Sequence, residues 1–106
     1  MENLEKDLRI DLITICDESK KIGYNPTRFL QMLYQWGPVE AVKKILVNKT
    51  WVQDGLTILW KKKRLDLSIE YLLSKNKKYN TLFSNEELKE AKNRIKKLHE
   101  KPIKKS

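Results

Sequence analysis

Few residues of this chain have the types and spacing that catalysis or metal binding requires. A metal site needs several cysteine, histidine or carboxylate side chains at set spacings. The chain has one cysteine, Cys16, and one histidine, His99, which fall in different predicted helices. Neither has ligand neighbours in the sequence. The pattern predicts a core position for Cys16 and a solvated helix-end cation at His99, and it predicts no metal site.

The acidic residues near the amino terminus are a second candidate for chemistry. Asp7 and Asp11 lie four residues apart, on one face of a predicted helix, and Asp17 and Glu18 follow. Such carboxylate pairs can bind magnesium. The alternative, which we favour, is a solvated acidic face or a set of partners for the basic half of the same chain. Three scattered glycines cannot form a glycine-rich phosphate loop. We therefore expect no enzyme activity, no cofactor and no small-molecule substrate.

The basic residues give a stronger signal. Lys61, Lys62, Lys63 and Arg64 form the densest run of charge, and Trp60 precedes them. Lysine and arginine neutralise phosphates, and a neighbouring exposed tryptophan can stack on a base. The alternatives are a core position for Trp60, which we favour, and a solvated loop for the lysines, which stays open. A second set lies on one side of the last predicted helix and comprises Lys89, Lys92, Lys96 and Lys97.

A helix-turn-helix is a weaker candidate, over Phe29 to Val47 with Pro38 to Val47 as the reading helix. The exposed residues of that helix would be Glu40, Lys43 and Lys44. A reading helix usually offers several arginine, asparagine, glutamine or serine side chains to the base edges. We therefore interpret this segment as ordinary helix packing.

The net charge of the 106-residue chain is +9, from 23 basic and 14 acidic residues. Residues 1–21 carry −2, residues 22–74 carry +4 and residues 75–106 carry +7. A basic surface favours polyanions such as DNA or RNA, acidic proteins or anionic lipid headgroups. A lysine-rich composition without any binding role is the alternative, and it is about equally compatible with these numbers.

The chain lacks the signals of a membrane or secreted protein. Its longest uncharged stretch, Phe29 to Val39, is far shorter than the roughly 20 apolar residues that span a membrane. The acidic start, Met1 to Glu5, does not look like a secretory signal. A single cysteine forms no internal disulfide. We expect a cytoplasmic protein that makes no membrane contact.

Apolar residues recur at helical spacing along most of the chain. We expect a single all-α domain over residues 1–106, a compact bundle of about six helices with a frayed tail at 103–106. The predicted helices cover residues 2–21, 26–36, 39–47, a segment from 56 into the lysine run, a segment after Asp66, and a segment from Ser84 to about Pro102.

Punctuating residues set the expected ends of these helices. Gly23 is a stop signal, and Asn25 caps a helix whose first residue is Pro26. Gly37 and Pro38 break the pattern before the next start. Asp66 is expected to cap the helix that follows it. Ser84 and Glu87 have the spacing of a capping box.

Three segments of the chain follow one another in a familiar order: Gly55 to Trp60, Arg64 to Glu70 and Leu82 to Leu88. Together with Phe29 to Leu33 and Val39 to Val42 upstream, they resemble a short helical module that recurs in bacterial proteins of unassigned function. The resemblance covers roughly Tyr24 to Ile95 and implies no catalytic residue. It implies an association with nucleases and defence proteins.

The residues of this pattern also have a physical interpretation. Its apolar members, such as Trp60 and Phe83, supply buried area, while Asp66 and Ser84 serve as caps. Its charged members Arg64 and Glu70 are expected to form ion pairs within the fold. A motif composed mostly of caps and apolar anchors indicates a defined fold rather than an active site.

Two functional hypotheses follow from the sequence. The first is a non-enzymatic, nucleic-acid-associated or defence-associated module that contacts phosphate backbones through the two sets of basic residues. The alternative is a protein-interaction module that self-associates or binds a larger partner through an apolar helix face or the acidic first helix. The candidate aromatic anchors for that role are Tyr24, Trp36, Trp51 and Tyr79.

Overall fold

The computed structural model describes residues 3–47 and 56–100, and all secondary structure within these residues is helical. The predicted all-α bundle is therefore confirmed. Outside the described residues lie the candidate anchor Trp51, the predicted helix end near Pro102 and the predicted tail at 103–106. The elements are α1 (Leu4–Lys21), α2 (Thr27–Val47), a helical segment over residues 56–61, η1 (Leu65–Leu67), α4 (Ile69–Lys75), η2 (Lys77–Leu82) and α5 (Asn85–Glu100).

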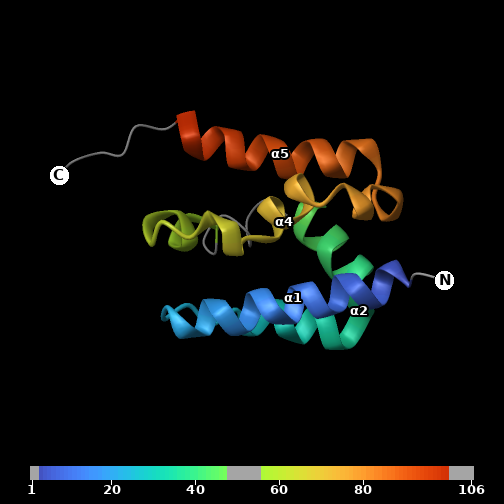
Figure 1. Ribbon diagram of the computed structural model, residues 1–106, viewed down its shortest axis with the longest axis horizontal. Coiled ribbons are helices and arrows are strands. Elements are labelled where there is room, and N and C mark those ends of the chain that lie inside the picture. Colours follow the sequence, from blue (N-terminus) through green and yellow to red (C-terminus); the bar gives the residue numbers. More distant parts are fainter. Residues whose placement is uncertain (1–2, 48–55, 101–106) are drawn as a thin grey trace.

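The helices are arranged in three tiers (Figure 1). The first half of α2 runs beside α1 on one side of the molecule, and α5 lies on the opposite side. The segments α4 and η2 lie between them, with α4 packed against α5 and η2 against α1. The second half of α2 crosses from the α1 side towards α5 (Figure 1).

Both ends of α1 are determined by local signals. The side chain of Asn3 accepts a hydrogen bond from the backbone N–H of Lys6 at 3.1 Å, which caps the first turn. At the other end Gly23 has a φ of +91°, and the N–H of Tyr24 donates to the carbonyl of Ser19 at 2.9 Å. A left-handed residue with this hydrogen bond is a common helix stop that favours glycine. The predicted stop at Gly23 is confirmed.

The predicted break at Gly37 and Pro38 is also confirmed. Gly37 has φ +83° and ψ 171° inside α2, so the helix bends sharply there. The start of α2 differs by one residue from the prediction. The carbonyl of Pro26 accepts the first helical hydrogen bond, from the N–H of Leu30 at 3.0 Å. Pro26 is thus the capping residue, and Thr27 is the first helical one.

The prediction that Asp66 caps the next helix is wrong. The carboxylate of Asp66 accepts two hydrogen bonds from the Arg64 guanidinium, at 3.0 and 3.1 Å. The cap of α4 is Ser68, whose Oγ accepts from the N–H of Tyr71 at 3.0 Å and donates to the carbonyl of Leu65 at 2.8 Å. The helix consequently begins at Ile69, after the short η1 turn.

The capping box at the start of α5 is confirmed in both directions. The Oγ of Ser84 accepts from the N–H of Glu87 at 3.1 Å. The carboxylate of Glu87 accepts from the N–H of Ser84 at 2.8 Å. The 3-10 helix η2 precedes α5 and contributes the buried Tyr79.

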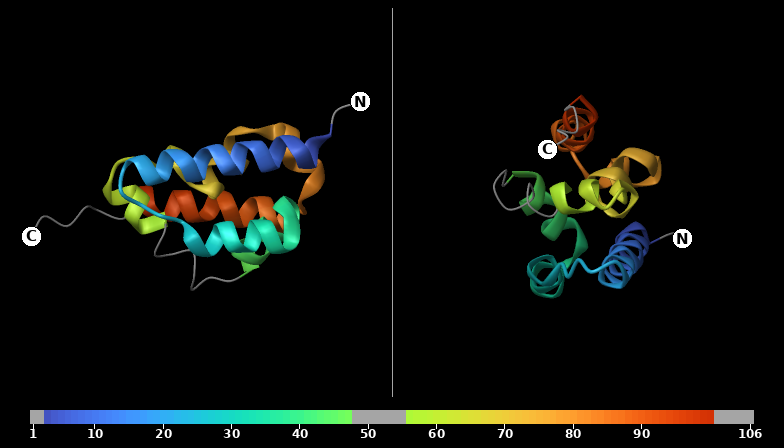
Figure 2. Two further views of the ribbon diagram at one scale, coloured as in Figure 1. Left: turned by 90° about the horizontal axis from the view of Figure 1, so that it is seen from below. Right: turned by 90° about the vertical axis from the view of Figure 1, so that its left-hand side faces the viewer.

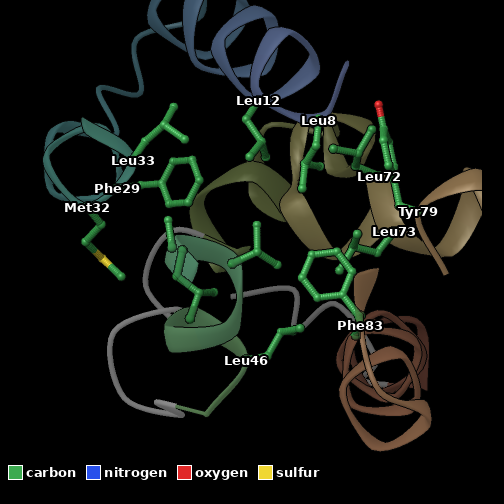
Figure 3. Packing of buried hydrophobic residues seen from close by; sticks show 14 of the residues in the cluster. Leu8, Leu12, Phe29, Met32, Leu33, Leu46, Leu72, Leu73, Tyr79 and Phe83 are labelled. Carbon is green, nitrogen blue, oxygen red and sulfur yellow. The ribbon is translucent and has the colours of Figure 1, made fainter. Parts of the chain in front are cut away.

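The core joins all tiers of the molecule (Figure 3). Tyr79 is fully buried in it, with 0% of its surface exposed, which excludes it as an exposed aromatic anchor. Cys16 is buried as predicted, and burial raises the pKa of its thiol to about 11. The buried members of the cluster are Leu8, Leu12, Cys16, Phe29, Met32, Leu33, Ala41, Val42, Ile45, Leu46, Leu72, Leu73, Tyr79, Phe83 and Ala91.

The hydroxyl of Tyr79 donates a hydrogen bond to the carboxylate of Asp11 in α1. We expect Tyr79→Phe to lower the free energy of unfolding at pH 7 by about 1–3 kcal/mol, since the acceptor is charged. Burial and the Asp11 carboxylate raise the pKa of Tyr79. Above a pH of about 10 the phenol ionises in the unfolded chain first, which favours unfolding.

The stability difference between the native protein and Tyr79→Phe should therefore shrink as the pH rises above about 10. Urea unfolding of both proteins from pH 7 upwards measures this difference. The lysines titrate in the same pH range in both proteins. Their contribution therefore cancels when one free energy of unfolding is subtracted from the other. A difference that stays constant with pH would contradict the assigned hydrogen bond.

Arg94 forms a buried ionic network that connects three helices. Its guanidinium lies 3.2 Å from the carboxylate of Glu70 in α4 and 2.7 Å from that of Glu90 one turn earlier in α5. It also donates to the carbonyls of Ile45 and Leu46, at 3.2 and 3.0 Å. These carbonyls belong to the last turn of α2, which Arg94 thus caps from another helix.

Candidate nucleic-acid interface

Lys61, Lys62 and Lys63, which we call the basic turn, are exposed at the end of the 56–61 helical segment. The N–H of Lys63 donates to the carbonyl of Trp60 at 3.0 Å, and the N–H of Arg64 donates to that of Leu59 at 2.8 Å. These two bonds form the same kind of helix stop as at Gly23. Here the left-handed position is occupied by Lys63, with a φ of +61°.

Lys63 is the only non-glycine residue with a positive φ among the described residues. The left-handed conformation costs a residue with a side chain about 1–2 kcal/mol, and glycine adopts it readily. The chain uses glycine at the equivalent stop of α1 but lysine here. Backbone strain of this kind often accompanies a functional side chain.

The basic turn lies against the carboxyl end of α1. A side-chain carbon built on Gly23 would lie 3.6 Å from the Nζ of Lys62. Lys20 and Lys21, both exposed, precede Gly23 at this end of α1. Sequence reasoning missed these two residues as site members, since no local pattern indicates which helix end the basic turn contacts. Lys21 pairs with Glu18 at 2.9 Å, which raises its pKa.

Four exposed lysines lie on α5, as predicted: Lys89, Lys92, Lys96 and Lys97, which we call the α5 lysines. They lie away from Ala91 and Leu98, which face the core. The carboxyl end of α5 lies at the same end of the molecule as the basic turn and the end of α1 (Figures 1 and 2). The fold therefore places the carboxyl end of α5, the helix that carries the second predicted set, on the side of the first set.

Arg64 differs from the other predicted site residues. It forms the internal ion pair that the sequence predicts, and its partner is Asp66. The hydrogen bond and charge of Asp66 raise the pKa of Arg64, and the Arg64 guanidinium lowers the pKa of Asp66. Its charge is thus balanced locally. Both side chains remain partly exposed, so the pair lies beside the basic turn without contributing net charge.

Ion pairing separates the basic residues into two groups. Within the described residues, no carboxylate lies within 4.0 Å of any lysine of the basic turn or of the α5 lysines. The same is true of Arg9, Lys6, Lys20, Lys44, Lys75 and Lys77. The internally paired residues are Lys21, Lys43, Arg64, Lys78 and Arg94.

The helix-turn-helix candidate is packed into the core, which favours our interpretation of it. Ala41, Val42, Ile45 and Leu46 of the second half of α2 are buried. Its lysines also have partners within the fold. The Nζ of Lys43 lies 4.0 Å from the Glu87 carboxylate, and the Nζ of Lys44 lies 4.6 Å from the centroid of the Trp36 ring. Trp60, the candidate stacking residue, is half-buried.

The acidic pair on α1 has partners from the basic half of the chain. The Nζ of Lys78 lies 4.0 Å from the Asp7 carboxylate, and Tyr79 donates to Asp11. These contacts agree with the interpretation that the acidic residues are partners for the basic half of the same chain. In residues 3–47 and 56–98, no cluster of three or more histidine, cysteine or carboxylate side chains is arranged to hold a metal ion. None of the described helices is long and apolar enough to cross a membrane.

No protein-family model, no curated protein and no solved structure matches the chain.

We expect Lys63→Gly to increase stability and to weaken polyanion binding at the same time. The substitution relieves the left-handed strain and should raise the free energy of unfolding by about 0.5–1 kcal/mol. It also removes one cation, which should reduce the slope of log affinity against log salt by about 0.9. Urea unfolding and binding to labelled DNA measure the two effects.

Gly23→Lys makes the opposite change at the end of α1. It places a lysine, instead of glycine, at a left-handed position, and so adds both a cation and backbone strain. It should destabilise the protein. If Lys63→Gly increases stability without any effect on binding, the strain at this position has no connection with ligand contact.

Proposed function

We propose that this protein is a non-enzymatic module that contacts the phosphate backbone of nucleic acid through the basic turn and the α5 lysines. One observation carries the proposal. The fold neutralises Arg64 and Arg94 internally, yet it leaves these seven lysines exposed and without a carboxylate partner among the described residues. Exposed cations without a carboxylate partner attract polyanions, and the release of counterions drives the binding.

The chemistry of these residues favours phosphate contact without sequence reading. Lysine is a flexible point charge, and backbone contacts position a protein without reading bases. The proposal includes a role beside nucleases or defence proteins, which rests on the module resemblance alone. It also includes a cytoplasmic location, where nucleic acid is present and the buried thiol of Cys16 stays reduced.

Fluorescence anisotropy across a salt series tests the proposal. The probes are labelled duplex DNA, single-stranded DNA and RNA, each in several unrelated sequences. Affinity should fall linearly in log salt, with a slope that counts the phosphates contacted, and should differ little between sequences. Absence of binding even at low salt would refute the proposal, and the net charge of +9 would then be a compositional feature only.

A second candidate function, self-association, is favoured by exposed apolar side chains on α1 and α2. Ile10 is 52% exposed, Tyr34 is 73% exposed and Trp36 is 40% exposed. Tyr34 follows the buried Leu33 in the sequence, but its own side chain lies in solvent. Light scattering distinguishes this candidate, because the mass should rise with protein concentration and should not depend on salt. Of the other predicted anchors, Tyr24 is half-buried.

A further inference from the structure

A cavity of about 170 Å³ lies between the last turns of α1, the start of α2, the 56–61 segment and the beginning of α4. It is close to the basic turn, since Leu56 and Leu59 of the same helical segment form part of its wall. Most of the wall is apolar. The side chains that define it best are Ile15, Phe29, Met32, Ile45, Leu59 and Ile69.

The buried polar groups in the wall are satisfied by the protein itself. Ser68 uses its hydroxyl as the cap of α4 and as a donor to Leu65. Glu70 has Arg94 as its counterion. In the described part of the chain, no buried side-chain nitrogen or oxygen lacks a hydrogen-bond partner. The thiol of Cys16, whose pKa is raised by burial, is protonated at neutral pH.

These walls determine which occupant is favourable. The cavity is partly open to solvent, and the exposed residues Asn25, Thr27 and Arg28 also line it. Its inner wall is apolar, and an apolar space of roughly 150 Å³ accepts a molecule such as benzene. A charged ligand placed against that inner wall would lose its hydration there without compensating hydrogen bonds. The cavity is large enough for a ring of about six to ten non-hydrogen atoms.

We propose that this cavity is a binding site for a small uncharged apolar ligand, such as an aromatic ring or a short aliphatic chain. The site is separate from the proposed phosphate contacts, which use none of its wall residues. It also differs from a catalytic pocket, because the ligand is bound and not converted. Recognition depends on shape and on removal of apolar surface from water.

Binding at this site would also affect the basic turn. The cavity wall includes Leu59, two residues before the turn, and Leu67, four residues after it. An occupant that contacts both would hold the segment between them in place. A ligand that binds the ordered form of this segment stabilises it, by linkage.

Titration with benzene, followed in methyl NMR spectra of the full chain, tests the proposal. Shifts should be confined to methyl groups of the wall, with Ile15, Ile45 and Ile69 as reporters, and should saturate. Ile10 and Ile58 are exposed and serve as internal controls. Absence of saturable shifts at the wall, or shifts of equal size at the two exposed residues, would overturn the proposal.

Cys16→Met provides the variant test, because Cys16 lines the cavity and methionine adds two non-hydrogen atoms there. It should weaken benzene binding by at least about tenfold. Leu12→Met is the matched control, one turn earlier on α1 and outside the wall. It should bind benzene like the native protein. Equal affinity in Cys16→Met would contradict the site.

The wild-type titration remains decisive if Cys16→Met does not fold. Because the probe is uncharged, its binding should not change with salt. The outcome is therefore independent of the nucleic-acid measurements, and either proposal can fail without the other.

Discussion

Replacement of Arg94 by alanine is expected to lower the free energy of unfolding by about 3–5 kcal/mol, the largest stability effect of any substitution considered for this fold. The side chain of Arg94 is 10% exposed, and that of its partner Glu70 is 3% exposed. Removal of the guanidinium would leave the Glu70 carboxylate buried without a counterion. It would also leave the carbonyls of Ile45 and Leu46 without their donor.

Urea unfolding followed by circular dichroism measures this loss. Arg64→Ala is the matched control, because it removes an arginine from an ion pair that is solvent-exposed. Such pairs contribute little, so the control should unfold close to the native protein. If Arg94→Ala changes stability no more than Arg64→Ala does, the network has no structural importance.

A double variant, Arg94→Met with Glu70→Leu, separates the ionic contribution from the packing. It removes both buried charges together, and such replacements are often neutral or stabilising. The double variant should therefore be more stable than Arg94→Ala. If it is equally unstable, the loss comes from the uncapped carbonyls of α2 and not from the unpaired Glu70.

The pH dependence of Arg94→Ala provides an independent check. Burial raises the pKa of the Glu70 carboxyl, while a backbone hydrogen bond and the Arg94 guanidinium oppose the increase. Without Arg94 the pKa should rise further. A raised folded-state pKa of an acid means that stability increases as the pH falls through that pKa. The deficit of the variant should therefore shrink towards acidic pH.

The triple substitution Lys61→Glu, Lys62→Glu and Lys63→Glu should abolish nucleic-acid binding at physiological salt and leave the fold intact. It reverses the charge of the whole basic turn and reduces the net charge of the chain from +9 to +3. Loss of three phosphate contacts alone would reduce the salt slope by about 2.7. All three side chains are exposed, so their removal opens no cavity in the core.

A charge-matched control distinguishes this surface from a general effect of net charge. Lys6→Glu, Lys44→Glu and Lys77→Glu together change three exposed lysines that lie outside the proposed interface. The control should retain binding, with at most a modest decrease from the lower net charge. Anisotropy at several salt concentrations compares the two variants. Unchanged binding in the first, or equal loss in both, would refute the assigned surface.

Local sequence signals predicted the parts of this fold that depend on neighbours in the chain. The stop at Gly23, the bend at Gly37 and the capping box of Ser84 and Glu87 each need only residues within one turn of helix. The exposed face of α5 follows from helical periodicity, which places its lysines opposite Ala91 and Leu98. These features could be predicted because the interactions that form them are short-range.

The features that sequence reasoning missed depend on residues far away in the chain. Arg94 belongs to a basic stretch of the sequence, but it is buried because Glu70 and the end of α2 surround it in the fold. Tyr79 is buried in the apolar core, where its hydroxyl finds a partner in Asp11 of α1, 68 residues earlier in the chain. No local pattern identifies such partners.

The candidate interface also has features that the sequence predicts and features that it does not. Exposure of the lysines could be predicted from their spacing and number. Their position relative to one another could not, since the contact of Lys62 with the end of α1 and the placement of α5 at the same end are tertiary features. The left-handed backbone of Lys63 also had no signal in the sequence, because the usual marker of such a stop is glycine.

The hydrogen bonds of Arg94 join α5 to α2 and α4, and they limit local unfolding of the domain. Separation of α5 from its neighbours would leave the Glu70 carboxylate and two α2 carbonyls without their hydrogen bonds to Arg94. Detachment of this helix therefore costs a large free energy. Its inward-facing amides should then exchange with deuterium only when the whole domain unfolds. The lysines on the outer face of α5 should therefore keep their positions until the whole domain unfolds.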